Sequence, residues 1–251
     1  ISDAHAFITS NLHHVKSDFR PKYHACPPIG WMNDPNGVIY YKDFYHVFYQ
    51  YHPYSAYWGP MHWGHFISKD LIKYHDAPIA LAPDQDEESG CFSGGAIIND
   101  KNQLVLMYTQ HYENGQVRER QNIAISDDGV TFVKNAHPIL TEGDIPAHSN
   151  KRDFRDPRPL KIGDYYYVLV GSKSEENIGQ ILVYQSKDLN EFQYHFTIGP
   201  HPLFGEMGEC PDLFHLDGKD VLLVSGINLK PMGKEYRKAN SSVAFIGHFD
   251  L

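Results

Sequence analysis

Cysteine is scarce in this sequence, and the few cysteines present form no recognisable site. Cys26, Cys91 and Cys210 are an odd number, so they cannot all pair within the chain, and none lies in a Cys-x-x-Cys spacing. The pattern therefore indicates neither a zinc site nor a redox motif. A reducing compartment is the simpler interpretation.

Long apolar runs and basic runs are missing as well. No segment approaches the roughly 18 consecutive apolar residues of a membrane helix, and the opening ISDAHAFITS lacks the charged start and apolar stretch of an export signal. The 22 Lys and Arg residues stand against 31 Asp and Glu residues, and no basic run could follow a phosphate backbone. We therefore expect no membrane and no nucleic-acid partner. The expected location is cytoplasmic, with secretion as the alternative because the chain begins with Ile1 and an upstream segment could have been removed.

Helical periodicity is scarce beyond about the first 15 residues, whereas strand patterns recur along the rest of the chain. From Gly37 onward, short runs rich in Tyr, Val, Ile and Phe are separated by turns of Gly, Asp, Asn and Lys. One type of strand–turn–strand hairpin begins near residues 38, 95, 158 and 211. A second type lies between these hairpins and carries Ser-Lys-Asp or Ser-Asp-Asp at its turn.

The alternation of the two hairpin types predicts an all-β propeller. Two hairpins form one four-stranded sheet, and the sheets recur every 53 to 63 residues, a period typical of propeller blades. A β-sandwich also contains many short strands, but it does not predict two hairpin types at a fixed period. The fourth unit reaches its second hairpin at VAFIGHFDL, where the sequence ends. We therefore expect an N-terminal extension over residues 1–18 and three and a half to four blades of an incomplete propeller over residues 19–251, inactive as an isolated piece because the ring stays open.

Acidic or polar pairs precede proline at the start of three of these units. The sequences are NDPNG at Asn33, RDPRP at Arg155 and ECPDL at Glu209, while the second unit has FSGG at Phe92. Each alone has a simpler explanation, as a turn, a structural ion pair or a solvated acid. Recurrence at the same place in three units instead predicts that the acids converge at one end of the central channel.

Clustered carboxylates beside aromatic side chains suit the cleavage of glycosidic bonds. One acid attacks or stabilises the sugar carbon, and another protonates the leaving oxygen. The segment FYHVFYQYHPYSAYWGPMHWGH supplies the aromatic side chains, of which we assign Trp58, with Gln50, to ligand binding and Trp63 to packing. His62 and His65 are not expected to bind metal, because no further ligand completes a site.

Four motifs in order resemble the hallmark motifs of glycoside hydrolase family 32, and the resemblance extends from about Phe19 onward. They are WMNDPNG, FSGG, RDP and ECPDLF. The resemblance implies that Asp34 is the nucleophile, Glu209 the general acid and base, and Asp156 a stabiliser that holds fructose hydroxyls. It also implies fructose-subsite positions at Asn33, Gln50, Trp58, Phe92, Ser93, Arg155 and Cys210. No metal and no cofactor are implied.

The same resemblance implies a five-bladed propeller followed by a β-sandwich domain, so the fifth blade and the sandwich are expected beyond residue 251. It implies a retaining β-fructofuranosidase whose substrate is a small sugar, sucrose or sucrose 6-phosphate. The reaction is expected to pass through a covalent fructosyl-aspartate intermediate. A fructosyltransferase and a fructan hydrolase are alternatives within enzymes. A non-catalytic sugar-binding propeller is the alternative outside them, although all three acids are present. Oligomeric state is left open.

Overall fold

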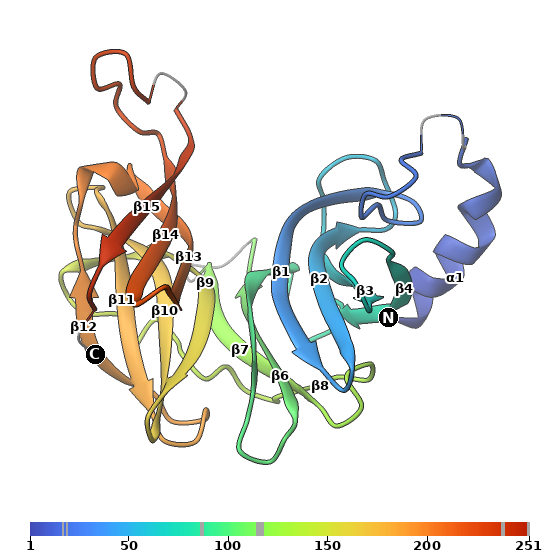
Figure 1. Cartoon of the computed structure of the whole chain (residues 1–251), viewed down its shortest axis with the longest axis horizontal. Helices are drawn as coiled ribbons and strands as arrows, with labels where there is room; N and C mark the ends of the chain where they lie inside the picture. The colour runs from blue at the N-terminus through green and yellow to red at the C-terminus, as the bar shows by residue number, and fades with distance from the viewer. Residues whose placement is uncertain (17, 19, 86–87, 114–117, 237–238, 250–251) are drawn as a thin grey trace. The chain divides into compact units, whose positions relative to one another are not determined.

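Strands make up almost all of the regular structure. The computed structural model describes residues 1–251 apart from 17, 19, 86–87, 114–117, 237–238 and 250–251. The described residues contain one α-helix, α1 (Ser2–Asn11), followed by a short 3-10 turn and then by strands (Figure 1). The predicted all-β class is therefore confirmed, and the weak helical pattern at the start of the chain corresponds to α1.

The strands form four antiparallel sheets, each built from consecutive strands, as expected for propeller blades. The first sheet contains β1 (Trp31–Tyr41), β2 (Phe44–His52), β3 (His62–Ser68) and β4 (His75–Leu81). The second contains β5 (Gly90–Ile98), β6 (Leu104–His111), β7 (Glu119–Ser126) and β8 (Val133–Lys134). The third contains β9 (Ser149–Ile162), β10 (Tyr165–Ser174), β11 (Gly179–Ser186) and β12 (Gln193–Ile198). In the described residues the fourth has three strands, β13 (Met207–Leu216), β14 (Lys219–Ile227) and β15 (Ser241–Gly247).

Both predicted hairpin types are present, but the predicted starts of the first type were wrong. The first strands begin at Trp31, Gly90, Ser149 and Met207, several residues before the predicted starts. The proline-containing motifs therefore lie inside strands and not in turns ahead of them. Proline and glycine indicate turns in the sequence, whereas the sheet accommodates them at register shifts.

The Ser-x-Asp turns of the second hairpin type share one hydrogen-bond pattern. In the β7–β8 turn, the backbone N–H of Gly129 donates to Ser126 Oγ at 2.8 Å. Asp128 Oδ1 accepts from the N–H groups of Val130 and Thr131 at 2.8 and 2.7 Å. Equivalent bonds form around Asp70 and Asp188. The side chains thus complete the backbone hydrogen bonding of all three turns.

The chain folds into two compact units. The first comprises Ile1–Leu106, Gln110–Glu113 and Ile123–Ala136, and the second comprises Met107–Thr109, Asn114–Asn122 and His137–Leu251. In the first unit, α1 packs through Ala4 and Ile8 on a cluster formed by Tyr49, Tyr51, Phe66 and Ile79. The helix of the predicted N-terminal extension is therefore docked on the first sheet.

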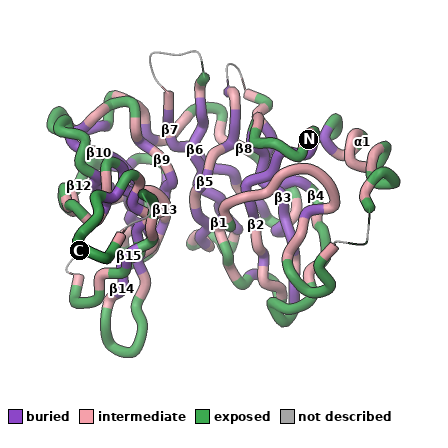
Figure 2. The backbone as a smooth tube through the Cα atoms, turned by 90° about the horizontal axis from the view of Figure 1, so that it is seen from above, coloured by how far each residue is buried: buried purple, intermediate pink, exposed green. Residues whose placement is uncertain are grey.

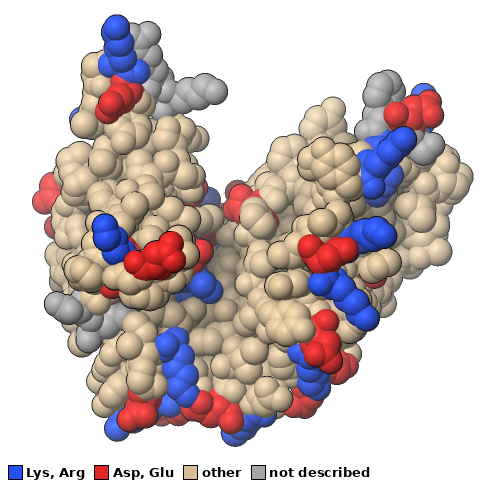
Figure 3. All heavy atoms as spheres, in the orientation of Figure 1, with Lys and Arg blue, Asp and Glu red and all other residues tan. Residues whose placement is uncertain are grey.

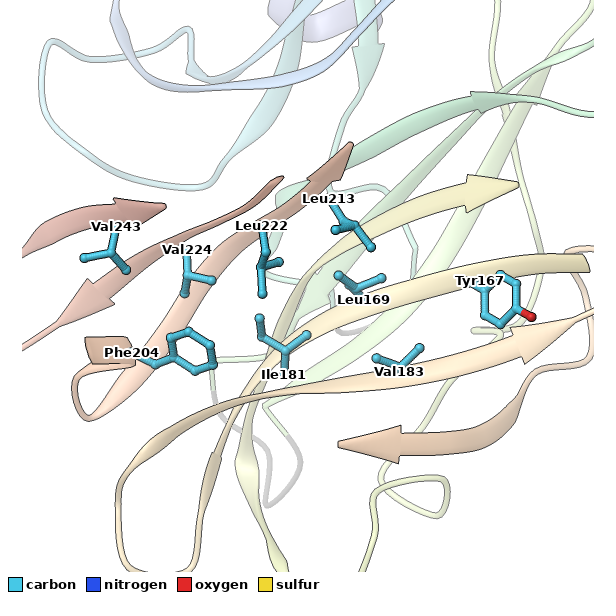
Figure 4. Close-up of a cluster of buried hydrophobic side chains, with 9 residues drawn as sticks. All are labelled: Tyr167, Leu169, Ile181, Val183, Phe204, Leu213, Leu222, Val224 and Val243. Carbon is cyan, nitrogen blue, oxygen red and sulfur yellow. The ribbon is translucent and has the colours of Figure 1, made fainter. Parts of the chain in front are cut away.

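The second unit contains a cluster of buried side chains that is mostly aliphatic (Figure 4). The side chains of this cluster come from β10, β11, β13, β14, β15 and a 3-10 helix (Pro202–Phe204), and they are Tyr167, Leu169, Ile181, Val183, Phe204, Leu213, Leu222, Val224 and Val243. Strands β10 and β11 are buried along most of their length, whereas β12 and β15 are largely exposed (Figure 2). Continuous apolar runs such as YYVLVG and ILVY therefore mark the inner strands.

Charged side chains of both signs lie close to one another on the face drawn in Figure 3. The protein as a whole carries a net charge of -9. No helix in the described part of the chain has the length and apolar character that a membrane crossing requires.

The Asp128 turn generates a pH-dependent prediction. The N–H groups of Thr131 and Val130 hold the pKa of Asp128 well below its usual 3.8, so ionised Asp128 stabilises the folded state above about pH 4 and loses this effect as the pH falls further. Because Asp128 is exposed, we expect Asp128→Asn to lower the free energy of unfolding at pH 7 by less than about 1 kcal/mol. Urea denaturation should show that the difference in free energy of unfolding between the unmodified protein and the variant becomes smaller below pH 4. Asp164→Asn, in the β9–β10 turn, is the control, and a pH-independent difference would contradict the prediction.

Candidate active site

Asp34 lies at a bulge in the first strand of the first sheet. The register of β1 on β2 shifts between Met32 and Pro35, so Asn33 and Asp34 together lie opposite one residue of β2, Gln50. Bulges of this kind redirect side chains away from the regular alternation of a strand. The hydroxyl of Ser93, on β5, donates to Asp34 Oδ2 at 2.7 Å. Two predicted site residues are therefore in direct contact.

Two further hydrogen bonds fix the backbone of β5 beside Ser93. Gln50 Nε2 donates to the carbonyl oxygen of Cys91 at 3.0 Å, and Trp63 Nε1 donates to that of Phe92 at 3.0 Å. Gln50 is 2% exposed and Trp63 is fully buried. The predicted packing role of Trp63 is confirmed, and Gln50 acts here by holding the strand that carries Phe92 and Ser93.

Trp58 and Phe92 form an aromatic surface in the first unit. Trp58 is 56% exposed and meets Phe92 edge-on with ring centroids 6.0 Å apart. Phe92 in turn stacks on His111 at 4.0 Å. A flat aromatic ring open to solvent is the kind of surface on which a sugar face packs. Asn33, the residue before Asp34, has a different contact, because its Oδ1 accepts from Trp31 Nε1 at 2.8 Å.

Arg155 is the centre of the charged group in the second unit. Its Nε and Nη2 both donate to Glu209 Oε1, at 3.1 and 2.8 Å. Its Nη1 donates to both oxygens of Glu119 at 3.3 Å and to Asp153 Oδ1 at 2.9 Å. Lys173 Nζ lies 2.8 Å from the other oxygen of Asp153. Glu209 therefore shares its cation with two other carboxylates.

The ionisation of this group follows from burial and charge. Burial by itself would lower the pKa of Arg155, but the carboxylates of Glu119, Asp156 and Glu209 outweigh burial and raise it above its usual value. Burial would also raise the pKa of Asp153, but hydrogen bonds from Lys173 and Arg155 lower it below its usual value. Arg155 thus stays cationic, and Asp153 stays anionic, near neutral pH.

Asp156 and Cys210 occupy corresponding bulges in β9 and β13. The register shifts between Arg155 and Arg158 on one strand and between Glu209 and Asp212 on the other. Both residues have positive φ angles, 62° for Asp156 and 46° for Cys210, which non-glycine residues rarely adopt. The Cys210 N–H donates to Asp156 Oδ2 at 2.9 Å. The bulge of one sheet therefore orients the carboxylate of the other.

The structure divides the predicted site residues between the two units. The first unit contains Asn33, Asp34, Gln50, Trp58, Phe92 and Ser93. The second unit contains Arg155, Asp156, Glu209 and Cys210. Within each unit the contacts above bring most of these residues together. Convergence of Asp34 with the second group stays a prediction.

Sequence reasoning missed Glu119, Asp153 and Lys173. Glu119 is the first residue of β7 and is 4% exposed. Its only signal in the sequence is that it stands a few residues before the apolar residues Ile123, Ala124 and Ile125. Asp153 and Lys173 lie on paired strands β9 and β10, and neither falls in a recognised motif. A buried acid such as Glu119 needs a cation, and only the fold reveals that Arg155 supplies it.

The histidines near Trp63 are engaged in other contacts. His62 Nδ1 lies 3.0 Å from the carbonyl oxygen of Pro60, and His65 Nε2 lies 3.0 Å from His46 Nδ1. Burial lowers the pKa of His62 to about 4 and that of His65 to about 3, so both rings are neutral at pH 7. Among the described residues, no group of three or more His, Cys, Asp or Glu side chains is arranged to hold a metal ion.

A buried lysine supports the strand that carries Phe92 and Ser93. Lys134 Nζ, on β8, lies 2.7 Å from Glu88 Oε2 and 2.9 Å from Asp84 Oδ1, and it donates to Cys91 Sγ at 3.5 Å. The Glu88 side chain is fully buried. Burial, followed by the charge of Glu88, raises the pKa of Cys91, so this cysteine is a thiol at neutral pH.

Consecutive antiparallel sheets are typical of a β-propeller, and the first strands of three of them carry an acid at or beside a bulge. The family model for the glycosyl hydrolases family 32 N-terminal domain matches residues 24–251. The chain therefore belongs to glycoside hydrolase family 32, which confirms the resemblance of its four motifs.

Curated relatives carry several names within this family. Sucrose-6-phosphate hydrolase from Escherichia coli is 42% identical over 238 residues, which cover 91% of this chain and 48% of that protein. Levanase from Bacillus subtilis is 39% identical over 256 residues, which cover 93% of this chain and 35% of levanase. The chain thus spans about half the length of the sucrose-6-phosphate hydrolases it matches.

Solved structures establish the fold. A GH32 β-fructofuranosidase from Bombyx mori matches with a TM-score of 0.90 at 40% identity, covering 99% of this chain and 53% of that one. A mutant of the same enzyme in complex with sucrose matches with a TM-score of 0.88 at 39% identity, with the same coverage. The predicted propeller is therefore confirmed, and the four sheets are its blades. The fifth blade and the β-sandwich beyond residue 251 stay predictions.

The buried ion pair of Lys134 gives a stability prediction. We expect Lys134→Met to lower the free energy of unfolding by about 3–5 kcal/mol, because it leaves the Glu88 carboxylate buried without a cation. Adding Glu88→Gln should recover much of the loss, since the double variant contains no unpaired buried charge. Guanidinium denaturation measures both. Lys42→Met, at an exposed lysine, is the control, and an equally small effect at both lysines would refute the role of the pair.

Proposed function

We propose that this protein is a retaining β-fructofuranosidase that cleaves sucrose or sucrose 6-phosphate. The observation that carries the proposal is a pair of differently held carboxylates on the family's motifs. Asp34 accepts a hydrogen bond from the hydroxyl of Ser93, and one oxygen of Glu209 accepts two from Arg155. Two carboxylates with separate roles are what retaining glycosidases need.

In the proposed first step, Asp34 attacks the anomeric carbon of the fructosyl unit. Glu209 gives its proton to the glycosidic oxygen, and the glucose portion leaves as the bond from carbon to that oxygen breaks. The product is a fructosyl ester of Asp34. The Ser93 hydroxyl orients the attacking carboxylate, and the aromatic surface of Trp58 and Phe92 supports the sugar.

In the proposed second step, water replaces glucose. Glu209, now ionised, takes a proton from the water as its oxygen attacks the anomeric carbon, and the ester bond to Asp34 breaks. Two displacements at one carbon retain its configuration. Asp156, whose Oδ2 accepts from the Cys210 N–H, accepts hydrogen bonds from fructose hydroxyls in both transition states.

The relatives support different substrates. The name of the Escherichia coli relative favours sucrose 6-phosphate, and the sucrose complex of the Bombyx mori enzyme favours sucrose. Levanase keeps fructan hydrolysis open, and fructosyl transfer would use the same intermediate with a sugar hydroxyl in place of water. The cytoplasmic location expected from the sequence stays a prediction.

The proposal predicts that both carboxylates are essential. We expect Asp34→Asn and Glu209→Gln in the full-length protein to lower kcat/KM for the preferred substrate by at least about 100-fold each, because each removes one role from both steps. Hexose release from sucrose and from sucrose 6-phosphate measures the loss, and the difference in rate between them assigns the substrate.

Asp43→Asn, in the β1–β2 turn, and Glu206→Gln, just before β13, are the matched controls at exposed acids and should keep full activity. Proton NMR of the first-formed fructose, before mutarotation, should show β-fructofuranose if configuration is retained. Oligosaccharide products at high sucrose would instead identify a transferase. If no hexose is released from any fructoside tested, the protein would instead be a non-catalytic sugar-binding propeller.

A further inference from the structure

Arg155 uses its donors unequally on the carboxylate of Glu209. Both Nε and Nη2 point to Oε1, at 3.1 and 2.8 Å, so a single oxygen receives two charge-assisted hydrogen bonds. Among the described residues of the second unit, none donates a hydrogen bond to Oε2 of Glu209. The two oxygens of this carboxylate are therefore chemically distinct.

The third donor group of Arg155 is held by Glu119. Nη1 lies 3.3 Å from both Glu119 oxygens, and the Glu119 side chain is 5% exposed compared with 22% for its other partner, Asp153. Glu119 Oε2 also accepts from the backbone N–H of Phe154 at 2.7 Å. Phe154 directly precedes Arg155. Glu119 therefore accepts hydrogen bonds both from the backbone of this segment and from the side chain of Arg155.

Neighbouring side chains of β6 and β7 hold the same segment. Gln121 Nε2 donates to the carbonyl oxygen of Phe154 at 2.6 Å, and Thr109 Oγ1 accepts from the N–H of Asp156 at 3.0 Å. Thr109 and Gln121 are also bonded to each other at 2.8 Å. All of these groups are buried. The position of Glu119 is consequently fixed by the sheet and does not adapt to Arg155.

We propose that Glu119 is a positioning residue that directs Arg155 onto Oε1 of Glu209, so that Oε2 carries the proton given to the leaving group. The inference rests on the proposed function of Glu209 as general acid. A proton on Oε1 would face two N–H donors, whereas a proton on Oε2 faces none from the described residues of the second unit. Without the charge of Glu119, the guanidinium is free to turn towards Asp153 and release Oε1, and the proton is then shared between both oxygens.

The test compares two leaving groups in the Glu119→Gln variant of the full-length protein. Glucose leaves sucrose as a poor leaving group that needs protonation, whereas p-nitrophenolate leaves an aryl β-fructofuranoside with little need of it. We expect kcat/KM for sucrose to fall by roughly 10- to 100-fold and that for the aryl fructoside by less than about 3-fold. The ratio of the two values is independent of how much of the sample is folded, so partial unfolding does not mask the result.

Two further variants sharpen the test. Glu142→Gln breaks the ion pair of Glu142 with Arg120, the neighbour of Glu119 on β7, and should leave the ratio of the two substrates unchanged. The double variant Glu119→Gln, Arg155→Lys should show no larger change in ratio than Arg155→Lys alone, because Glu119 acts through Arg155. If the two substitutions change the ratio additively, Glu119 does not act through Arg155 and the proposed positioning role is wrong.

The outcomes separate this inference from the proposed function. If the unmodified protein cleaves both substrates and Glu119→Gln loses both equally or neither, the positioning role is wrong and the general acid assignment is untouched. If the unmodified protein cleaves neither sucrose, sucrose 6-phosphate nor the aryl fructoside, the proposed function itself fails.

Discussion

A proline interrupts the first strand of three blades, and a bulge at each one keeps the sheet intact. Pro35, Pro157 and Pro211 cannot donate to a neighbouring strand, and the register of β1, β9 and β13 shifts beside them. Asp34, Asp156 and Cys210 lie at these irregular positions. A bulge turns a side chain away from the direction that regular strand alternation would give it. The chemistry proposed for the site therefore depends on backbone irregularities that proline imposes.

Buried charge is the second constraint on both units, and each meets it differently. In the first unit, Lys134 lies against Glu88 and Asp84 and holds the segment that leads into β5. In the second, Arg155 lies among Glu119, Asp153 and Glu209 and so connects a structural carboxylate to a catalytic candidate. Removing either cation would leave carboxylates without compensation in surroundings of low polarity. Stability and the proposed reaction thus depend on the same kind of interaction.

The relatives define the family but leave a choice of substrate within it. Proteins of similar identity are named for sucrose 6-phosphate and for levan, and a structural neighbour was solved with sucrose. The site residues of this chain act on the fructosyl side of the bond in the proposed mechanism, which all of these substrates share. Differences between the substrates lie in the leaving group, so the proton delivery proposed for Glu209 is the step at which the proposed role of Glu119 would change their cleavage rates most directly.

The sequence alone was enough to predict the repeated hairpins, the blades and the motif positions of the acids, because strand alternation and turn residues are local signals. It misplaced the strand starts, since proline in NDPNG, RDPRP and ECPDL has the same local signature in a turn and in a bulge. Only the tertiary structure revealed that Glu119 and Asp153 share Arg155 with Glu209, and that Lys134 supports Glu88 and Cys91. Those partners are brought together by strand pairing across tens of residues, and no periodicity in the chain encodes which buried acid meets which cation.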